Sequence, residues 1–390
     1  MKKILSLLML AVMLLSVACA GTKTEDGTTP AETDAAKEIK IGVFEPMTGA
    51  NAAGGAMEVE GIQLANELYP EVNGMKVVLV LADNKSDKVE AANAASMLVD
   101  QEKVTAIIGS WGSGLSMAAG PIIQDAKIPT VGASCTNPLV TLDNEYYQRV
   151  CFIDSFQGTV MAKYAFENLG ATKAAIIQEI SSDYSVGLVN YFNESFIGLT
   201  GDKDAILGTA SYNTGDQDFS AQLSNIKKLN ADVIFAPGNY TESALLIKQA
   251  RELGITTPII GGDTWEAPEF LEIGGAAVEG AAFSTFFTSD VPITKESETF
   301  LKAYRDKYNK EPASVTALGY DAYLVILDAI ERSGSTDPVE IQKALAQTTD
   351  FEGAAGMISL DANGDAIKSA VIKKVENGVF KYMATIDPIK

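Results

Sequence analysis

Histidine is absent from the 390 residues of this chain. Without it, the protein can build neither a Ser-His-Asp nor a Cys-His nucleophile, and no zinc or iron site with imidazole ligands. Cysteine is scarce as well, because beyond Cys19 only Cys135 and Cys151 remain, too few for a metal site made of cysteines alone. Lysine, tyrosine or carboxylate chemistry stays open, but the commonest routes to hydrolysis are closed. We therefore expect no enzyme, no metal and no organic cofactor.

Positive charge is also in short supply. The chain has 30 lysines and arginines against 51 aspartates and glutamates, for a net charge of −21. Nucleic acids and anionic lipid surfaces are bound through basic patches. We therefore expect no nucleic-acid partner and no peripheral attraction to anionic lipid; acidity of this degree mainly serves solubility.

The N-terminus carries an export signal. An apolar run of about 15 residues follows Lys2 and Lys3 and ends in small residues, as in a secretory signal peptide, here residues 1–18. The Cys19 position resembles a bacterial lipobox, which implies cleavage before Cys19 and lipid attachment to its thiol; the alternative is a chance cysteine beside an ordinary signal. Residues 19–37 then form a disordered stalk, because they lack the apolar side chains that a core needs. We expect an exported protein held to the outer face of the cell membrane by lipid alone, on the periplasmic side if the cell has an outer membrane.

The rest of the chain alternates strand-like and helix-like segments, which predicts an α/β fold with doubly wound parallel sheets. In the first half, apolar runs predict strands and periodic segments predict helices. The predicted strands are 39–46, 75–84, 104–111 and 128–134, and the predicted helices are 55–70, 88–103 and 116–126. Ligands bind beyond the carboxyl ends of such strands. The loops 44–54, 109–116 and 133–138 are therefore the expected binding loops.

The pattern repeats in a second lobe of similar size. Its predicted helices are 159–170, 185–199, 219–230 and 241–254, and its predicted strands are 173–180, 205–213, 231–238 and 257–263. No basic, Gly-rich or Pro-rich linker separates the halves, so we expect several chain crossings. Helices at 295–309, 317–333 and 337–347 follow, and a hairpin at 369–386 turns at Asn377-Gly378, a strong hairpin signal.

Eight segments in order resemble one family. They are IKIGVFEPMTG, IIGSWGSGLSMAAGPI, IPTVGASCTNPLVT, CFIDSFQG, AIIQEISSDYSVGL, APGNYTESALLIKQARELG, IIGGDTW and ALGYDAYLVILDAIERSG. Over residues 38–390 the chain resembles the periplasmic binding proteins for leucine, isoleucine and valine, the type I substrate-binding proteins of ABC importers. The resemblance implies two Rossmann-like lobes joined by a hinge of several crossings. We expect lobe 1 to comprise 38–154 and 287–352, and lobe 2 to comprise 155–286 and 353–390.

The resemblance also implies a site for a free amino acid. Ser113 matches the serine that holds the ligand carboxylate, ahead of a helix whose N-terminus favours anions. In the stretch Ser134, Cys135 and Thr136, a backbone carbonyl accepts from the ligand ammonium and the threonine donates to the carboxylate. Asp263 matches the acidic residue that pairs with the ammonium through a charge-assisted bond. Helix capping, loop capping and a solvated strand end are the structural alternatives for these positions.

Aromatic residues of both lobes complete the expected site. Tyr184 and either Tyr240 or Asn239 match second-lobe contacts, and a tyrosine offers the ligand both an apolar face and a hydroxyl. Trp111 flanks a matched loop and is expected to wall the side-chain pocket. Core packing is the structural alternative for each of these aromatic residues.

Two further patterns need interpretation. Residues 361–365 resemble the start of a calcium loop, but the glycine and glutamate of such loops are missing, so we interpret them as a turn. Cys135 and Cys151 flank a short stretch, and the exported setting permits a disulfide. Whether they pair stays open, because the sequence does not give the distance between them.

Three classes of function compete. The first is a transport receptor that delivers an amino acid, branched-chain or otherwise apolar, to the permease and ATPase complex of an ABC transporter. The second is a ligand-binding sensor of the same fold, and the third is an enzyme, disfavoured by the missing histidine. The lipobox favours the first, since no membrane-spanning or signalling segment follows it. A short amide or urea is the alternative ligand, but the Ser113, Thr136 and Asp263 set favours a zwitterion.

Overall fold

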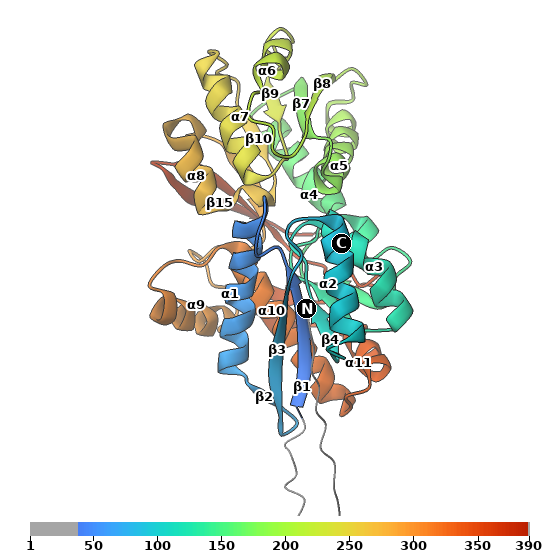
Figure 1. The fold of residues 1–390 in the computed structure, drawn as a ribbon. Helices are drawn as coiled ribbons and strands as arrows, with labels where there is room; N and C mark the ends of the chain where they lie inside the picture. Colours follow the sequence, from blue (N-terminus) through green and yellow to red (C-terminus); the bar gives the residue numbers. More distant parts are fainter. Residues whose placement is uncertain (1–37, 389–390) are drawn as a thin grey trace, which may run out of the picture. The chain divides into compact units, whose positions relative to one another are not determined.

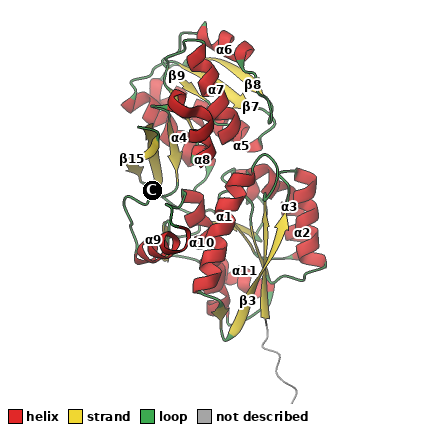
Figure 2. Cartoon of the chain, turned by 60° about the vertical axis from the view of Figure 1, so that its left-hand side comes forward, coloured by secondary structure: helices red, strands yellow, loops and turns green. Residues whose placement is uncertain are grey.

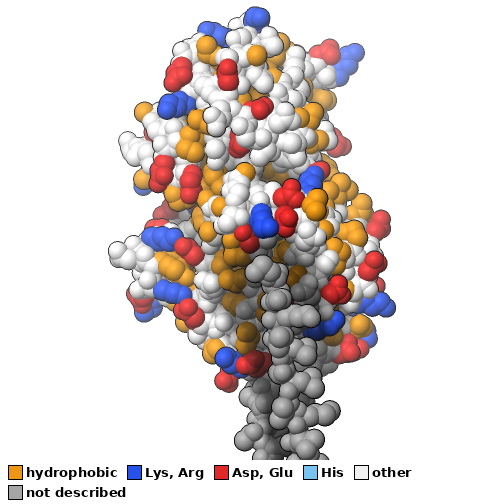
Figure 3. All heavy atoms as spheres, viewed as in Figure 1, with side chains coloured by type: hydrophobic (Ala, Val, Ile, Leu, Met, Phe, Trp, Pro, Cys, Tyr) orange, Lys and Arg blue, Asp and Glu red, His pale blue; other side chains and the backbone are white. Residues whose placement is uncertain are grey.

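The computed structural model describes residues 38–388. The predicted signal peptide, the lipid-attachment residue Cys19 and the stalk at 19–37 lie outside the described residues and stay predictions. Within residues 38–388, none of the helices combines the length and the apolar character that crossing a bilayer requires. On the face in Figure 3, Lys and Arg side chains are interspersed with Asp and Glu rather than gathered together.

The first sheet is a six-stranded sheet with the order β2-β3-β1-β4-β5-β6. Its strands are β1 (Glu38–Glu45), β2 (Glu71–Val72), β3 (Met75–Asp83), β4 (Ala106–Ile108), β5 (Thr130–Gly132) and β6 (Tyr147–Arg149). All pair in parallel except β2, which is antiparallel to β3. Helices α2 (Lys88–Asp100) and α3 (Ser113–Ala126) pack together on one side, and α1 (Ala52–Leu68) packs with α10 (Ser314–Ser333) on the other (Figure 1). The sheet is therefore doubly wound, as the alternating segments predict.

The second sheet has seven strands in the order β15-β14-β11-β10-β9-β7-β8. Its strands are β7 (Ala174–Glu179), β8 (Ile206–Tyr212), β9 (Val233–Phe235), β10 (Ile259–Gly261), β11 (Ala282–Thr285), β14 (Ala370–Glu376) and β15 (Val379–Ile386). The first five are parallel, and β14 and β15 add an antiparallel edge. Its helices are α4 (Asp154–Lys163), a π-helical turn (Tyr164–Asn168), α5 (Asp183–Thr200), α6 (Ser220–Lys227), α7 (Tyr240–Glu252) and α8 (Pro268–Gly274). The predicted hairpin is confirmed: Asn377 and Gly378 both have positive φ, as a two-residue turn between twisted strands requires.

The chain crosses between the lobes three times. It leaves the first sheet after β6, returns after β11, and joins β14 after a small hairpin of β12 (Phe351–Gly353) and β13 (Gly356–Ile358). Both ribbon views place α9 (Lys295–Tyr308), α10 and α11 (Pro338–Leu345) beside the first sheet (Figures 1 and 2). The β12–β13 hairpin packs against α9 and α10. The expectation of a hinge with several crossings is thus confirmed, while the exact lobe boundaries stay a prediction.

Several glycines mark close approaches between elements. A Cβ on Gly61 of α1 would collide with the carbonyl of Thr316 in α10, and one on Gly319 would collide with the carbonyl of Glu58. These two glycines let α1 and α10 pack with their backbones nearly in contact. Helices α3 and α4 each begin several residues before the predicted start, with Gly114 and Gly158 inside them. Glycine lowers helix propensity, but here it makes room for a neighbouring segment.

Candidate functional site

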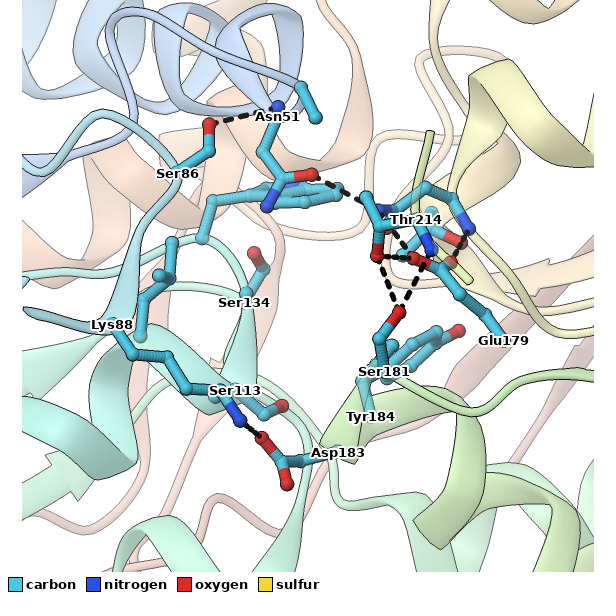
Figure 4. Close-up of a pocket in the computed structure, with 18 of the residues that line it drawn as sticks. Asn51, Ser86, Lys88, Ser113, Ser134, Glu179, Ser181, Asp183, Tyr184 and Thr214 are labelled. Carbon is cyan, nitrogen blue, oxygen red and sulfur yellow. Dashed lines mark hydrogen bonds and ion pairs between the residues drawn. The ribbon is translucent and has the colours of Figure 1, made fainter. Parts of the chain in front are cut away.

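A cavity of about 110 Å³ lies between the carboxyl ends of the parallel strands of the two sheets. All three binding loops predicted for the first lobe contribute to its wall, and the loops after β7, β9 and β10 supply the opposite side (Figure 4). Its lining residues are Ala50, Asn51, Ser86, Lys88, Trp111, Gly112, Ser113, Gly114, Leu115, Ser134, Glu179, Ser181, Ser182, Asp183, Tyr184, Thr214, Asn239, Asp263 and Thr264. Switch-point loops of this kind are where doubly wound sheets bind ligands.

The structure brings together five of the eight ligand-binding residues predicted from the sequence. Those in the cavity wall are Trp111, Ser113, Ser134, Tyr184 and Asp263. The other three, which are Cys135, Thr136 and Tyr240, lie behind the wall. The roles of all eight as ligand contacts stay predictions.

Ser113 is the first residue of α3. Gly112 before it has a φ of 95°, a backbone conformation that favours glycine. The Ser113 hydroxyl accepts the Asn137 backbone N–H at 3.1 Å, which leaves its own proton free for an acceptor in the cavity. Because the N-terminus of α3 adds partial positive charge, this corner suits a carboxylate.

The Ser134–Thr136 stretch turns from the wall into the protein interior. Ser134 lines the cavity and donates its hydroxyl hydrogen bond to the buried Glu58. The Cys135 carbonyl accepts from the Arg149 guanidinium, so that oxygen is already engaged. The Thr136 hydroxyl is buried and has no hydrogen-bond partner within the described chain. Of the three residues, only Ser134 faces the cavity directly.

Asp263 follows β10 and is almost fully buried. Its Oδ1 accepts from Gln157 Nε2 at 2.6 Å and from the Tyr184 hydroxyl at 2.9 Å. Burial raises the pKa of Asp263 to about 6, although these two hydrogen bonds lower it in part. The carboxylate is therefore ionised at neutral pH in a site that water barely reaches.

A cluster of unpartnered acceptors surrounds Asp263. Both Asp154 carboxyl oxygens, Gln157 Oε1 and Thr136 Oγ1 are buried without a hydrogen-bond partner among residues 38–388. Asp154 lies beside Thr136 and near Asp263; burial and then the Asp263 charge raise the pKa of Asp154 well above its usual range. Buried polar groups are normally paired. Of these residues only Asp263 lines the cavity, so its carboxylate is the one placed to meet a cationic donor there.

Trp111, which lines the cavity in the first lobe, contacts Tyr240 of the second lobe. The Trp111 ring packs against Gly54, where a side chain would collide with it. Tyr240 meets the Trp111 ring edge-on at 6.3 Å between centroids. The Tyr240 hydroxyl donates to the Ala50 carbonyl at 3.1 Å and accepts from the Ala53 N–H at 3.3 Å. Tyr240 does not line the cavity. It holds Trp111 and the loop around Ala50, which form part of the first-lobe wall.

Sequence reasoning missed two polar features of the cavity. Glu179 at the end of β7 accepts the Asn239 N–H at 2.9 Å and the Thr214 hydroxyl, and burial raises its pKa. Lys88 and Asp183, which begin α2 and α5, form an ion pair at 2.6 Å between the lobes (Figure 4). An acidic residue at a strand's carboxyl end could have pointed to Glu179; no local signal pointed to the ion pair.

Within the described residues, the structure answers the question of the cysteine pair and confirms the turn at 361–365. Cys135 and Cys151 are both buried as free thiols, so no disulfide joins them. Contact with the Cys151 thiol lowers the pKa of Cys135 to about 7. Residues 361–365 form a turn in which Asp361 accepts the Asn363 and Asp365 N–H groups. Asp365 forms an ion pair with Arg149 at 2.7 Å, so its carboxylate is already used.

Known proteins share this architecture. A family model described as periplasmic binding protein matches residues 38–378. The structure of leucine binding protein LivK from Thermotoga maritima MSB8 is 48% identical with a TM-score of 0.87, covering 90% of this chain and 99% of that one. The branched-chain amino acid transporter substrate binding protein LivJ from Streptococcus pneumoniae, solved with isoleucine, is 35% identical with a TM-score of 0.83, covering 90% and 99%. Leu/Ile/Val-binding protein homolog 1 of Brucella abortus is 30% identical over 348 residues, 87% of this chain and 91% of the relative.

Proposed function

Because this chain belongs to the periplasmic binding protein family, a family of substrate-binding proteins, we propose that it serves an ABC importer and binds a free amino acid between its lobes. The favoured ligands are branched-chain or other apolar amino acids, which the protein would deliver to its permease and ATPase complex. The chain would work outside the cytoplasm, anchored through lipid on Cys19. A mass spectrum of the mature protein that still contains residues 2–18 would contradict the anchor.

The observation that supports this function best is that the wall of one cavity carries both a donor for a carboxylate and an acceptor for an ammonium. The Ser113 hydroxyl, at the start of α3, offers a donor to a carboxylate. Asp263, in the wall of the same cavity, offers an ionised acceptor to an ammonium. A zwitterionic amino acid carries both groups on one carbon atom. A neutral amide or urea would leave the Asp263 charge without a partner, at a cost.

The size and walls of the cavity fit a small ligand. Its volume of about 110 Å³ is far below the range of roughly 300–1,000 Å³ that holds drug-sized molecules. Trp111 and Leu115 supply apolar surface in the wall, which suits an apolar side chain. The relatives named for leucine, isoleucine and valine agree with this choice.

A thermal-unfolding screen against the twenty amino acids, urea, acetamide and benzoate tests the proposal. A ligand at 100 times its dissociation constant adds about 2.7 kcal/mol of apparent stability. We expect leucine, isoleucine or valine to stabilise the protein most. Benzoate is the informative comparison, because it carries a carboxylate without an ammonium. Stabilisation by benzoate, urea or acetamide and by no amino acid would overturn the assignment.

A sensor of the same fold is the second candidate. It would bind the same ligand, so binding alone does not separate the two functions. Uptake of radiolabelled ligand by cells with and without the protein does so, because a transport receptor is required for uptake and a sensor is not.

A further inference from the structure

Two glutamates are completely buried behind the first-lobe wall of the cavity. Glu45 is the last residue of β1, and Glu58 lies in the second turn of α1; neither is exposed to solvent. The ionisable groups that face them are the Cys135 thiol, the Tyr147 hydroxyl and Asp263, and none of these is a cation. Buried carboxyl groups usually have a cationic partner. This pair therefore needs another way to avoid two unbalanced charges.

The two carboxyl groups face each other and reach two ligand-facing loops. Glu45 Oε2 accepts the Trp111 N–H at 2.7 Å, and the Ser110 hydroxyl lies 3.4 Å away. Glu58 Oε1 accepts the Ser134 hydroxyl. The remaining oxygens, Glu45 Oε1 and Glu58 Oε2, have no partner other than each other's carboxyl group within the described chain.

Two carboxylates in contact away from water cannot both ionise, so they share a proton. We propose that Glu45 and Glu58 hold one proton between them as an acid pair, and that this pair positions Trp111 and Ser134 in the cavity wall. The role in ligand binding rests on the proposed function; the shared proton does not.

If the two glutamates share a proton, the free energy of unfolding should depend on pH. Burial raises the pKa of Glu58 to about 8, and burial with the neighbouring Glu58 raises that of Glu45 well above its usual range. Near neutral pH the folded pair therefore keeps at least one proton, whereas unfolded glutamates with a pKa of about 4.3 have lost theirs. The pair therefore favours folding most at low pH, and this contribution is lost as the pH rises toward about 8. Once both carboxyl groups have ionised at still higher pH, two facing charges would repel and loosen both loops.

The first experiment needs no ligand. Urea unfolding of the full chain is followed from pH 5 to pH 8.5 for the wild type, Glu58→Gln and the control Glu67→Gln, an exposed residue in the last turn of α1. Glutamine keeps the shape, accepts from Ser134 and donates to Glu45 without titrating. We expect the wild type and the control to lose stability relative to Glu58→Gln as the pH rises. Parallel pH profiles for all three proteins would overturn the shared proton.

The second experiment measures L-leucine affinity by titration calorimetry at pH 6.5 to 9. The ligand ammonium titrates identically with wild type and variant. The ratio of the wild-type to the Glu58→Gln dissociation constant therefore reports only the effect of the glutamate pair. We expect Glu58→Gln to bind within about threefold of wild type at pH 6.5. Above pH 8 the wild type should weaken relative to it by up to roughly tenfold per pH unit, as for one linked proton.

Two results would overturn the positioning role. One is a folded Glu58→Gln variant that binds L-leucine more than tenfold more weakly than wild type at pH 6.5. Binding would then depend on a negative charge on Glu58 and not on the shared proton. The other is a constant ratio across the pH range. If Glu58→Gln does not fold, Glu45→Gln serves in both experiments with the same expectations. If wild type binds no leucine, the proposed ligand is wrong, and the unfolding experiment still decides the shared proton.

Discussion

At the scale of single residues, Asp263 holds a charge where water barely reaches. Losing one partner of a buried charge pair costs about 3–5 kcal/mol. We expect Asp263→Ala to weaken ligand binding by roughly 10²–10³-fold or more, at about 1.4 kcal/mol per decade. Asp263→Asn should recover little, because it keeps the shape and loses the charge. Titration calorimetry with the ligand found by the screen measures both variants.

The matched control for this experiment is Glu266→Gln. Glu266 lies three residues further on, is also buried, and pairs with Lys373 at 2.6 Å away from the cavity wall. It should change stability more than affinity. If Asp263→Ala binds within about threefold of wild type, the ammonium assignment is wrong.

Asp263 also predicts how binding depends on acid pH. Its pKa in the folded protein is raised to about 6, mainly by burial. An ammonium binds the ionised form, so below pH 6 binding must release a proton, and the affinity should fall by roughly tenfold per pH unit. Calorimetry in two buffers of different ionisation enthalpy counts the protons released; no release at pH 5 would contradict the prediction.

At the scale of elements, a buried ion pair ties the first lobe crossing to the third. Arg149 in β6 is fully buried, and its Nε pairs with Asp365 at 2.7 Å. Asp365→Ala leaves that guanidinium without this partner, so we expect a loss of about 3–5 kcal/mol in the free energy of unfolding. Urea unfolding measures it, with Asp306→Ala in the exposed Lys302 pair as control. If Asp365→Ala lowers the free energy of unfolding no more than the control does, the Arg149–Asp365 pair contributes no more than an exposed ion pair.

The helix starts of α2 and α5 meet at the Lys88–Asp183 ion pair. Gly114 of α3 lies beneath it, and a Cβ there would crowd the Asp183 carboxylate and the Lys88 stem. Both charged side chains are partly exposed, so the pair is worth at most about 1 kcal/mol. We expect Lys88→Met to weaken ligand binding by up to roughly fivefold at low salt and by less at high salt. Lys85→Met removes a pair within one lobe and should change nothing; equal effects of the two variants would contradict a role in closure.

Local patterns predicted most elements but few of the buried contacts. Apolar runs located strands such as β3, predicted at 75–84 and found at Met75–Asp83. The helix starts of α3 and α4 were placed too late, because glycine lowers local helix propensity while the need for close packing acts through distant segments. In the sequence, nothing distinguishes Glu58 from an ordinary residue on the polar face of a helix. Its burial against Glu45 is set by tertiary packing. Lys88 and Asp183 are neighbours only after both lobes have folded.

At the scale of the whole molecule, two lobes around one cavity form a clamp. Asn239 donates to Asn51 at 3.1 Å, and Asn137 donates to the Asp183 carbonyl at 3.0 Å, so the lobes already touch at the rim. A ligand that contacts both lobes shifts the balance toward the closed form. We expect small-angle scattering to show a smaller radius of gyration at saturating ligand. An unchanged scattering profile would count against hinge closure.

The packing of α1 against α10 also sets the order in which the molecule can be completed. A ribosome makes α1 early, but α10 follows only after all the parallel strands of the second sheet have been made. Until then, the face of α1 around Gly61 has no partner, and contacts between segments so distant along the chain form slowly. The first lobe, although it is begun first, therefore cannot be completed until the parallel strands of the second lobe have been made. A nascent chain stalled before Ser314 would expose an incomplete first core, which is the kind of surface that chaperones bind.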